Sequence, residues 1–338
     1  MNILVTGIGG FVGSTLCNEL LKFKNINIIG IDDLSYGDLS NINNFKKKIK
    51  IINKDICYLK LSDLKKYGKI SIIIHLAAIA PLPDNQTNPY QSMKNNVAGT
   101  ANLLEISRFL EIKKFIFISS GAVYERTNSK KNKLSEKDDV NTVLIYPTSK
   151  IFGEKLCDIF FETYNLPTTK IRLFNLYGPK QNYTRKHPPL LSQIIKSILQ
   201  DKKIVIYNLN KNIKRDYIYI DDLIELISNI IKDKKNKLPR LINACSGESL
   251  SVPDIIMKIE KILQKKLIIS KSKKISNFWG KYNKLFVGKY KINDFIIENE
   301  VYKNAEGNPK LFKKIIKRKP INFETGIKNC IEYAKKTI

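Results

Sequence analysis

The feature that most constrains the fold is the start of the chain, where an apolar segment leads into closely spaced glycines. Residues Asn2–Thr6 have the composition of a short strand, and the glycines that follow are Gly7, Gly10 and Gly13. Glycines at this spacing allow a tight turn, let backbone N–H groups approach a pyrophosphate and let a helix pack on the sheet. From Phe11 to about Phe23 apolar residues recur at helical spacing, so the N-terminus of this helix would face the phosphates. This order predicts a dinucleotide-binding unit.

The next predicted strand, Ile26–Ile31, ends at two acidic residues that bear on the choice of cofactor. Asp32 and Asp33 follow the glycines by about 20 residues, where a carboxylate can accept hydrogen bonds from both ribose hydroxyls of an adenosine. A carboxylate there would also repel a 2′-phosphate. We therefore expect NAD rather than NADP.

Strands and helices alternate through the first half of the chain. Further strands are predicted at Lys50–Asn53, Ile70–Ile74 and Lys114–Ile118, and a long helix is predicted from Asn88-Pro89 to about Phe109. This alternation predicts an α/β fold with a doubly wound parallel (Rossmann) sheet. Ligands gather at the carboxyl ends of such strands, and the small Ala77 and Ala78 would let the backbone lie against a dinucleotide. A plain buried turn is the alternative explanation for the two alanines.

A tyrosine and a lysine lie one helical turn apart in the stretch Ile145-Tyr146-Pro147-Thr148-Ser149-Lys150. Residues at this spacing share one face of a helix, so the Lys150 charge favours the ionised form of Tyr146. The positive end of the helix dipole acts in the same direction, and proline is tolerated in the first turn. We therefore expect the Tyr146 pKa to be lowered, so that the phenol can accept a proton. The same spacing also occurs by chance on amphipathic helices.

Composition restricts the classes of function. The net charge is +28, but the basic residues are mostly lysines scattered along the chain, without a basic stripe interleaved with aromatics, so no specific nucleic-acid partner is expected. Five cysteines without paired metal spacing suit a reducing cytoplasm, and two histidines, His75 and His187, make a metal site improbable. The chain has no run of about 18 apolar residues and starts without a leader pattern, so we expect a cytoplasmic protein with no membrane span.

These motifs together resemble the extended short-chain dehydrogenase/reductase family, specifically the NAD-dependent epimerases and dehydratases of nucleotide sugars. The resemblance covers roughly the first 260 residues and rests on seven motifs in order: Thr6-Gly7-x-x-Gly10-Phe11-x-Gly13, His75-Leu76-Ala77-Ala78, Asn96-Val97-x-Gly99-Thr100, Ser119-Ser120-x-x-Val123-Tyr124, Tyr146-x-x-x-Lys150, Arg172-Leu173-Phe174-Asn175-Leu176-Tyr177-Gly178-Pro179 and Arg215-Asp216-Tyr217-Ile218-Tyr219-Ile220-Asp221-Asp222.

The resemblance implies a catalytic set of Ser120, Tyr146 and Lys150. Ser120 and Tyr146 would bond the sugar hydroxyl that is oxidised, and Lys150 would hold the nicotinamide ribose and lower the Tyr146 pKa. Asn175 and Arg215 would contact the diphosphate or the uridine-like end of the substrate. The implied cofactor contacts are Gly7, Gly10, Phe11, Val12, Gly13, Asp32, Asp33, Asp55, Ile56, Leu76, Ala77, Ala78, Asn96, Tyr146, Lys150 and Phe174.

The family pattern also implies two domains and a homodimer. Residues 1–174 would form the NAD-binding domain, with return elements at about 212–246. Residues 175–211 and 247–338 would form the smaller C-terminal α/β domain, which binds the nucleoside-diphosphate sugar in a cleft between the two.

The chain departs from the family pattern at two places. Glu125 and Arg126 follow Tyr124 where the family usually has glycine, and a polar loop is expected at Thr127–Asp139. Residues 265–307 lack the arginine pattern with which many relatives bind the second phosphate; they offer lysines and aromatics such as Trp279, Tyr282 and Tyr290. Within them, Lys265–Lys274 is expected to be a solvated loop or hairpin. The nucleotide and the sugar therefore stay open.

The reaction type depends on Gly121 and Ala122. The 4,6-dehydratases that this chain resembles carry an acidic pair at these positions, whereas neither residue here can exchange a side-chain proton. The leading hypothesis is therefore inversion at C4 through a transient 4-keto sugar. A net oxidoreductase using the same site and an inactive NAD-binding sensor remain the alternatives.

Overall fold

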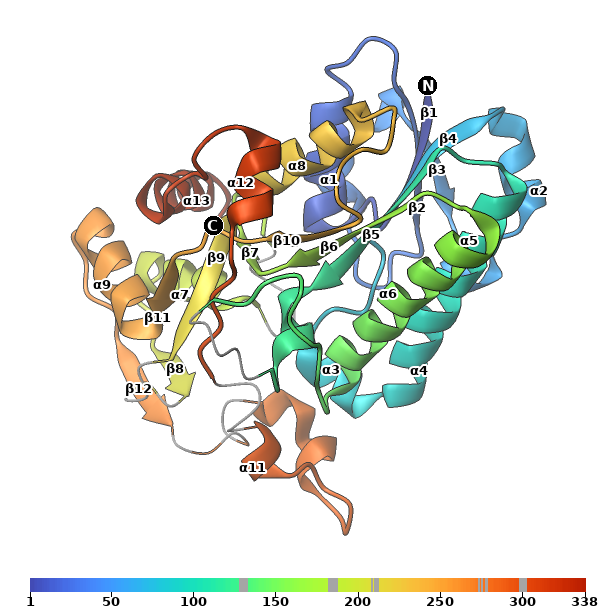
Figure 1. The fold of residues 1–338 in the computed structure, drawn as a ribbon. Coiled ribbons are helices and arrows are strands. Elements are labelled where there is room, and N and C mark those ends of the chain that lie inside the picture. Colours follow the sequence, from blue (N-terminus) through green and yellow to red (C-terminus); the bar gives the residue numbers. More distant parts are fainter. Residues whose placement is uncertain are drawn as a thin grey trace.

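Seven parallel strands form the central sheet of the protein, in the order β10-β6-β5-β4-β1-β2-β3 (Figure 1). The computed structural model describes residues 1–127, 133–181, 188–207, 209, 213–272, 274, 276, 279–297 and 303–338. Because β1 lies between β2 and β4, the direction of winding reverses beside β1, and a ligand crevice is expected there. The strands are β1 (Asn2–Thr6), β2 (Asn27–Asp32), β3 (Lys50–Asn53), β4 (Ile70–His75), β5 (Lys114–Ser120), β6 (Thr168–Leu173) and β10 (Leu241–Ala244).

Two helical layers cover this sheet because successive strand residues point to opposite faces. Ile3 and Val5 pack into one core cluster with α1 (Phe11–Leu20) and α8 (Ile220–Lys232). Leu4 packs into another, with α5 (Gly99–Phe109) and α6 (Ile145–Tyr164). The result is the doubly wound α/β sandwich predicted from the alternation of strands and helices (Figure 1).

The long helix predicted from Asn88-Pro89 to Phe109 is continuous but irregular. It consists of α4 (Pro89–Met93), a π-helical turn at Lys94–Ala98 and α5. The π turn holds the buried side chains of Asn95 and Asn96. Such turns are frequent at functional sites, and this one lies beside the carboxyl end of β4.

Smaller sheets form the C-terminal part. A three-stranded sheet has the order β11-β9-β7, and β8 pairs with β12 in parallel. Within the predicted return segment 212–246, α8 and β10 join the central part, whereas β9 belongs to the three-stranded sheet. The segment Lys265–Lys274, expected to be a loop or hairpin, contains strand β12 instead. These strands are β7 (Asn175–Tyr177), β8 (Ile204–Tyr207), β9 (Lys214–Tyr219), β11 (Ser249–Ser251) and β12 (Ile269–Ser272).

The remaining elements are short helices and the helices of the small part. No helix among the described residues is long and apolar enough to cross a membrane. These elements are η1 (Leu39–Ile42), η2 (Lys46–Lys48), η3 (Ile56–Tyr58), α2 (Leu61–Leu64), η4 (Lys65–Tyr67), α3 (Leu82–Thr87), η6 (Gly121–Tyr124), α7 (Leu190–Leu199), α9 (Val252–Leu263), η7 (Gly280–Phe286), α11 (Asp294–Ile296), α12 (Lys310–Ile316) and α13 (Phe323–Thr337).

Residues 279–297 join the two parts of the molecule through a separate apolar cluster. Trp279 and Tyr282 are buried there against Leu144, which precedes α6, and against Tyr207 of β8. The segment also packs on α3, and its α11 projects at the bottom of the molecule in Figure 1. The aromatics noted in the sequence at 279 and 282 are therefore core residues that connect α6 to β8.

Candidate active site

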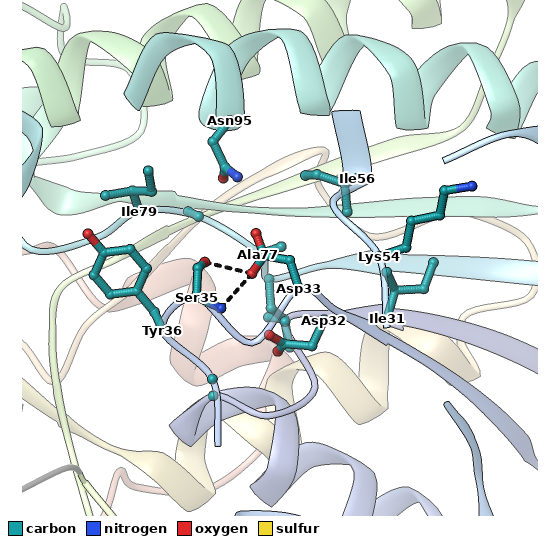
Figure 2. A pocket seen from close by; sticks show the side chains of 15 residues that line it. Ile31, Asp32, Asp33, Ser35, Tyr36, Lys54, Ile56, Ala77, Ile79 and Asn95 are labelled. Carbon is teal, nitrogen blue, oxygen red and sulfur yellow. Dashed lines mark hydrogen bonds between the residues drawn. The ribbon is translucent and has the colours of Figure 1, made fainter. Parts of the chain in front are cut away.

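A cavity opens at the carboxyl ends of β1, β2 and β4, where the winding of the sheet reverses (Figure 2). Eight of the predicted cofactor residues line it: Gly7, Gly10, Asp32, Asp33, Ile56, Leu76, Ala77 and Ala78. The other seven lining residues were not predicted as cofactor contacts: Ile31, Ser35, Tyr36, Gly37, Lys54, Ile79 and Asn95. Most of these seven lie within a few residues of a predicted strand end, and that position was the signal that could have identified them.

The glycines are required here by close backbone packing. Gly7 has φ +71°, and a Cβ at this residue would lie 2.9 Å from the backbone nitrogen of Ala77. A Cβ at Gly13 would collide with the Gly7 carbonyl oxygen. Closely packed backbone therefore forms the part of the wall beside Gly7, just before the start of α1.

Asp32 lines this cavity, and its carboxylate accepts hydrogen bonds from two loops of the wall. Its Oδ2 accepts a hydrogen bond from the Gly9 N–H (2.8 Å), and its Oδ1 accepts one from the Leu34 N–H (2.9 Å). Burial raises the pKa of this carboxyl, and the two hydrogen bonds oppose the shift. The oxygens keep lone pairs for ribose hydroxyls. Asp33 is exposed and accepts hydrogen bonds from the N–H (3.0 Å) and the hydroxyl (2.6 Å) of Ser35, drawn in Figure 2.

Two further predicted cofactor residues support the wall without lining it. Asp55 accepts a hydrogen bond from the Cys57 N–H (2.8 Å) at the start of η3, which presents Ile56 to the cavity. Asn96 bonds both backbone groups of Ile79, at 2.8 and 3.1 Å, and donates to the Ser149 hydroxyl (3.0 Å).

The start of α1 contributes the last group of predicted cofactor contacts. Phe11 and Val12 are the first residues of this helix, and Gly13 follows them. None of the three is among the residues that line the cavity. Their cofactor contacts therefore remain predictions.

A second cavity of about 370 Å³ adjoins the catalytic set. It brings together five predicted residues from four parts of the chain: Ser120, Tyr146, Phe174, Asn175 and Arg215. The remaining lining residues are Ala80, Leu82, Gly121, Ala122, Glu125, Leu173, Leu190, Tyr207, Ile213, Tyr217, Leu250, Val252 and Ala305. No local sequence pattern indicated Glu125 and Tyr207 as residues of this site, because only the fold brings them to the same cavity.

Tyr146 and Ser120 face each other at one end of this cavity. Ser120 is the last residue of β5 and Tyr146 the second residue of α6, and a hydrogen bond from Ser120 acts on the pKa of the Tyr146 phenol. Burial nevertheless raises the pKa of Tyr146, and the Glu125 charge adds to this, while the Ser120 hydrogen bond opposes it. The prediction of a lowered pKa is therefore wrong: desolvation of the phenol is the largest influence on it, and the Lys150 ammonium one turn away is bonded to the Ile118 carbonyl oxygen.

The Lys150 side chain contacts the end of β5. Its ammonium donates a hydrogen bond to the Ile118 carbonyl oxygen (2.9 Å) and lies 5.9 Å from the centre of the Tyr146 ring. Burial lowers the pKa of Lys150 to about 8, while the nearby Glu154 charge opposes the shift. The ammonium is held by backbone, in reach of a group that binds between β5 and α6.

A buried ion pair fixes the helix that carries Tyr146 and Lys150. Glu154, one turn after Lys150, pairs with Arg172 of β6 at 2.7 Å and accepts a hydrogen bond from the Ser119 hydroxyl (2.5 Å). Arg172 also donates to the Tyr124 hydroxyl (2.6 Å). This network connects α6 to β5 and β6, so the catalytic residues sit on rigid elements.

Comparison with known proteins agrees with this geometry. Residues 3–245 match the model of the NAD dependent epimerase/dehydratase family. The chain belongs to this family. As a member of the family, it uses NAD, and the first cavity fits that cofactor. A Cβ at Gly7 would meet the backbone of Ala77 in the cavity wall, so only glycine fits there. Asp32 offers carboxylate oxygens where the adenosine ribose would bind.

Relatives of this epimerase/dehydratase chain include proteins of both reaction types. It is 32% identical over 298 residues to an uncharacterized UDP-glucose epimerase, YtcB, of Bacillus subtilis (strain 168), covering 84% of this chain and 90% of that protein. It is 33% identical over 276 residues to a dTDP-D-glucose 4,6-dehydratase of Dictyostelium discoideum, covering 77% of this chain and 62% of that protein.

A solved structure of the same family covers the whole chain. The UDP-glucuronic acid 4-epimerase from Bacillus cereus, in complex with UDP-glucuronic acid and NAD, matches with a TM-score of 0.83 and 27% identity over 100% of both chains. Within the described part of this epimerase/dehydratase chain, no group of three or more His, Cys, Asp or Glu residues could hold a metal ion. His187 lies outside the described residues.

Proposed function

We propose that this protein is an NAD-dependent epimerase that inverts C4 of a nucleoside-diphosphate hexose through a transient 4-keto sugar. The observation that carries the proposal is that Ser120 and Tyr146 line the wall of the second cavity together, with Lys150 one turn behind. The names of the Bacillus subtilis and Bacillus cereus relatives support epimerisation and make UDP the first nucleotide to test.

In this mechanism Tyr146 takes the proton of the sugar 4-hydroxyl. Bound NAD supplies the chemistry of taking a hydride from C4 and returning it. Ser120 donates a hydrogen bond to the oxygen as the ketone forms, a contribution that reaches about 10²-fold when the donor is preorganised. Inversion requires the sugar to present its other face before the hydride returns, and Tyr146 then gives the proton back.

Lys150 has two roles in this proposal. Its ammonium holds the nicotinamide ribose, and its charge favours the tyrosinate once the site is occupied. Its pKa of about 8 means that the ammonium loses its proton in mildly alkaline solution. We expect Lys150→Met to lower both NAD affinity, measured by calorimetry, and turnover. A variant that lost turnover alone would contradict the cofactor role.

Gly121 and Ala122 favour epimerisation over dehydration. Elimination of water needs an acid for the departing hydroxyl, and neither residue has one. A Cβ at Gly121 would lie 3.0 Å from the Phe174 ring, so an acidic side chain there would displace that ring. Ala122 lines the cavity with only a methyl group.

Turnover in deuterated water tests the reaction type. A 4-epimerase returns product without solvent deuterium on carbon, because the hydride stays within the site. Deuterium at C5 together with a keto-deoxysugar product would show a dehydratase. Stoichiometric consumption of added NAD would instead show the net oxidoreductase, and a complete lack of turnover on UDP-, GDP-, CDP- and dTDP-sugars would leave a binding protein. Thermal shifts with the same panel identify the nucleotide, because a ligand that binds the folded state raises the melting temperature.

A further inference from the structure

A buried pair of opposite charges joins α6 to β6. Arg172 donates two hydrogen bonds to the Glu154 carboxylate, from Nε to Oε1 (2.9 Å) and from Nη2 to Oε2 (2.7 Å). Both side chains are 7% exposed, so water screens their charges little. The charges of this pair therefore act on other groups that are buried beside it.

Lys150 is the catalytic group that lies next to this pair. It precedes Glu154 by four residues on α6, a spacing that places both side chains on one face of the helix. Burial lowers the pKa of Lys150 to about 8, and the Glu154 charge opposes this shift. Without the carboxylate, the buried ammonium would lose its proton at a still lower pH.

Other groups around Lys150 do not replace this carboxylate. Besides burial, two ionisable side chains of the described chain act on the Lys150 pKa, Glu154 and Cys157, both on α6. Burial raises the pKa of Cys157, so that thiol is neutral, and burial lowers the pKa of His75 of β4 to about 3, so that imidazole is neutral too. The buried and half-buried charged groups on the elements packed against α6 are Asp84, Lys94, Lys114, Glu125, Lys170 and Arg172.

The same two residues of α6 also hold the end of β5. Lys150 donates to the Ile118 carbonyl oxygen (2.9 Å), and Glu154 accepts from the Ser119 hydroxyl (2.5 Å). Hydrogen bonds to charged groups are stronger than those between neutral groups. Ser120 is the next residue of β5, so its position relative to α6 depends on Lys150 and Glu154 being charged.

We propose that Glu154 and Arg172 are positioning residues of the active site, in which Glu154 keeps the Lys150 ammonium charged and Arg172 limits the negative charge that Lys150 meets. The inference rests on the proposed role of Lys150 in holding the nicotinamide ribose. It goes beyond that role because neither Glu154 nor Arg172 is among the residues that line the two cavities. Both act through Lys150 and transfer no proton.

The test is the calorimetric affinity for NAD between about pH 6 and about pH 10, a range that contains the Lys150 titration. The wild-type affinity should fall as the pH rises through about 8, and the midpoint of this fall is the alkaline limit. Lys150→Met has no proton to lose there, so it should bind NAD more weakly and show no such fall. A fall that persists in Lys150→Met would belong to another group and would overturn the inference.

Substitutions on the two sides of the pair should move the alkaline limit in opposite directions. Glu154→Gln removes the negative charge and should lower the limit by about one pH unit. Arg172→Met leaves the carboxylate without its partner and should raise the limit. Arg172→Lys keeps the positive charge, so its limit should stay close to that of the wild type. A purely structural role would not produce shifts of opposite sign.

Two further variants keep the test decisive if the single substitutions prevent folding, since removing one partner leaves a buried charge unpaired. The double variant Glu154→Gln/Arg172→Met has neither charge, so its limit should lie between those of the wild type and Glu154→Gln. Glu162→Gln makes the same charge change on α6 at a side chain that is 72% exposed, and its limit should match the wild type.

Three outcomes would overturn the inference. They are a wild-type affinity that does not fall with pH, shifts of the same sign in Glu154→Gln and Arg172→Met, and a double variant with the wild-type limit. Failure of the epimerase proposal is distinguishable, because NAD binding needs no sugar. A wild type that shows the alkaline limit and turns over no sugar would contradict the epimerase and support the role of the pair.

Discussion

The two cavities of this protein are built in different ways. The cofactor cavity uses residues between Gly7 and Asn95, nearly all directly after a strand of one sheet. The substrate cavity draws on residues from Ala80 to Ala305, including both smaller sheets and the loop beyond η6. A site made from consecutive strand ends can therefore be predicted from local spacing, whereas a site made where separate parts of the chain meet cannot.

The two cavities also differ in the groups that line them. Backbone groups and the Asp32 carboxylate dominate the first, and their positions follow from glycine spacing and strand length. The second has a largely apolar wall that also contains polar and charged side chains, among them Ser120, Tyr146, Glu125 and Arg215. Substitutions on the cofactor side should therefore change NAD binding or folding, and those on the substrate side should change turnover.

The largest expected effect is on the substrate side. Tyr146→Phe removes the proton acceptor while keeping the ring, so turnover should fall by at least about 10²-fold, the usual contribution of a general acid–base group. NAD and sugar nucleotide should bind nearly normally, measured by calorimetry. A variant retaining more than half of the activity would place the proton acceptor elsewhere.

The next largest effect is the pH dependence of stability caused by His75, which lies beneath the cofactor cavity at the end of β4. His75 is buried between the Thr6 and Thr100 hydroxyls, at 2.8 and 2.9 Å, and burial lowers its pKa to about 3, with the Lys150 charge adding to this. The unfolded chain binds a proton near pH 6.5, so stability is fully present above that pH and falls as pH drops toward 3.

Urea unfolding of wild type and His75→Gln at several pH values measures this. Between pH 6.5 and 5 the wild type should lose about 2 kcal/mol more unfolding free energy than the variant, at about 1.4 kcal/mol per pH unit. Parallel curves for the two proteins would show that His75 does not stay neutral in the fold.

A smaller effect is expected for cofactor choice. The wild type should bind NAD at least about tenfold more tightly than NADP, roughly 1.4 kcal/mol. Asp32→Ala should weaken NAD binding and reduce this preference, because the carboxylate that meets the ribose is gone. Glu332→Ala is the matched control, since it removes an exposed carboxylate of α13 that does not line the cofactor cavity. Equal calorimetric affinity of the wild type for both cofactors would contradict the role of Asp32.

The smallest effect is expected for Trp279→Phe, where the two parts of the molecule join. Trp279 is 2% exposed, and its indole N–H has no hydrogen-bond partner among the described residues. Trp279→Phe loses ring area but removes an unsatisfied donor, whose burial costs about 1–3 kcal/mol, so the unfolding free energy should change by less than about 1 kcal/mol. Trp279→Ala should cost about 3–5 kcal/mol. Equal losses in both variants would show that the indole N–H is satisfied.

Sequence patterns predicted the parts that depend on neighbours in the chain. Asn2–Thr6 is the first strand, as predicted, and the predicted Gly7 turn lines the cofactor cavity. The predictions that the structure contradicts concern properties that depend on what packs around a residue. The Tyr146 pKa moves opposite to the expectation because desolvation of the phenol is the largest influence on it, and β12 forms because β8 lies beside it.

Local patterns along the chain were enough to predict the doubly wound parallel sheet, the glycine turn after β1 and the acid at the end of β2, because periodicity and spacing act over a few residues. The packing of distant segments was needed to bring Glu125, Tyr146 and Arg215 to the same cavity. Burial and the field of distant charges depend on what packs around a group, and residues far apart in the chain supply that packing.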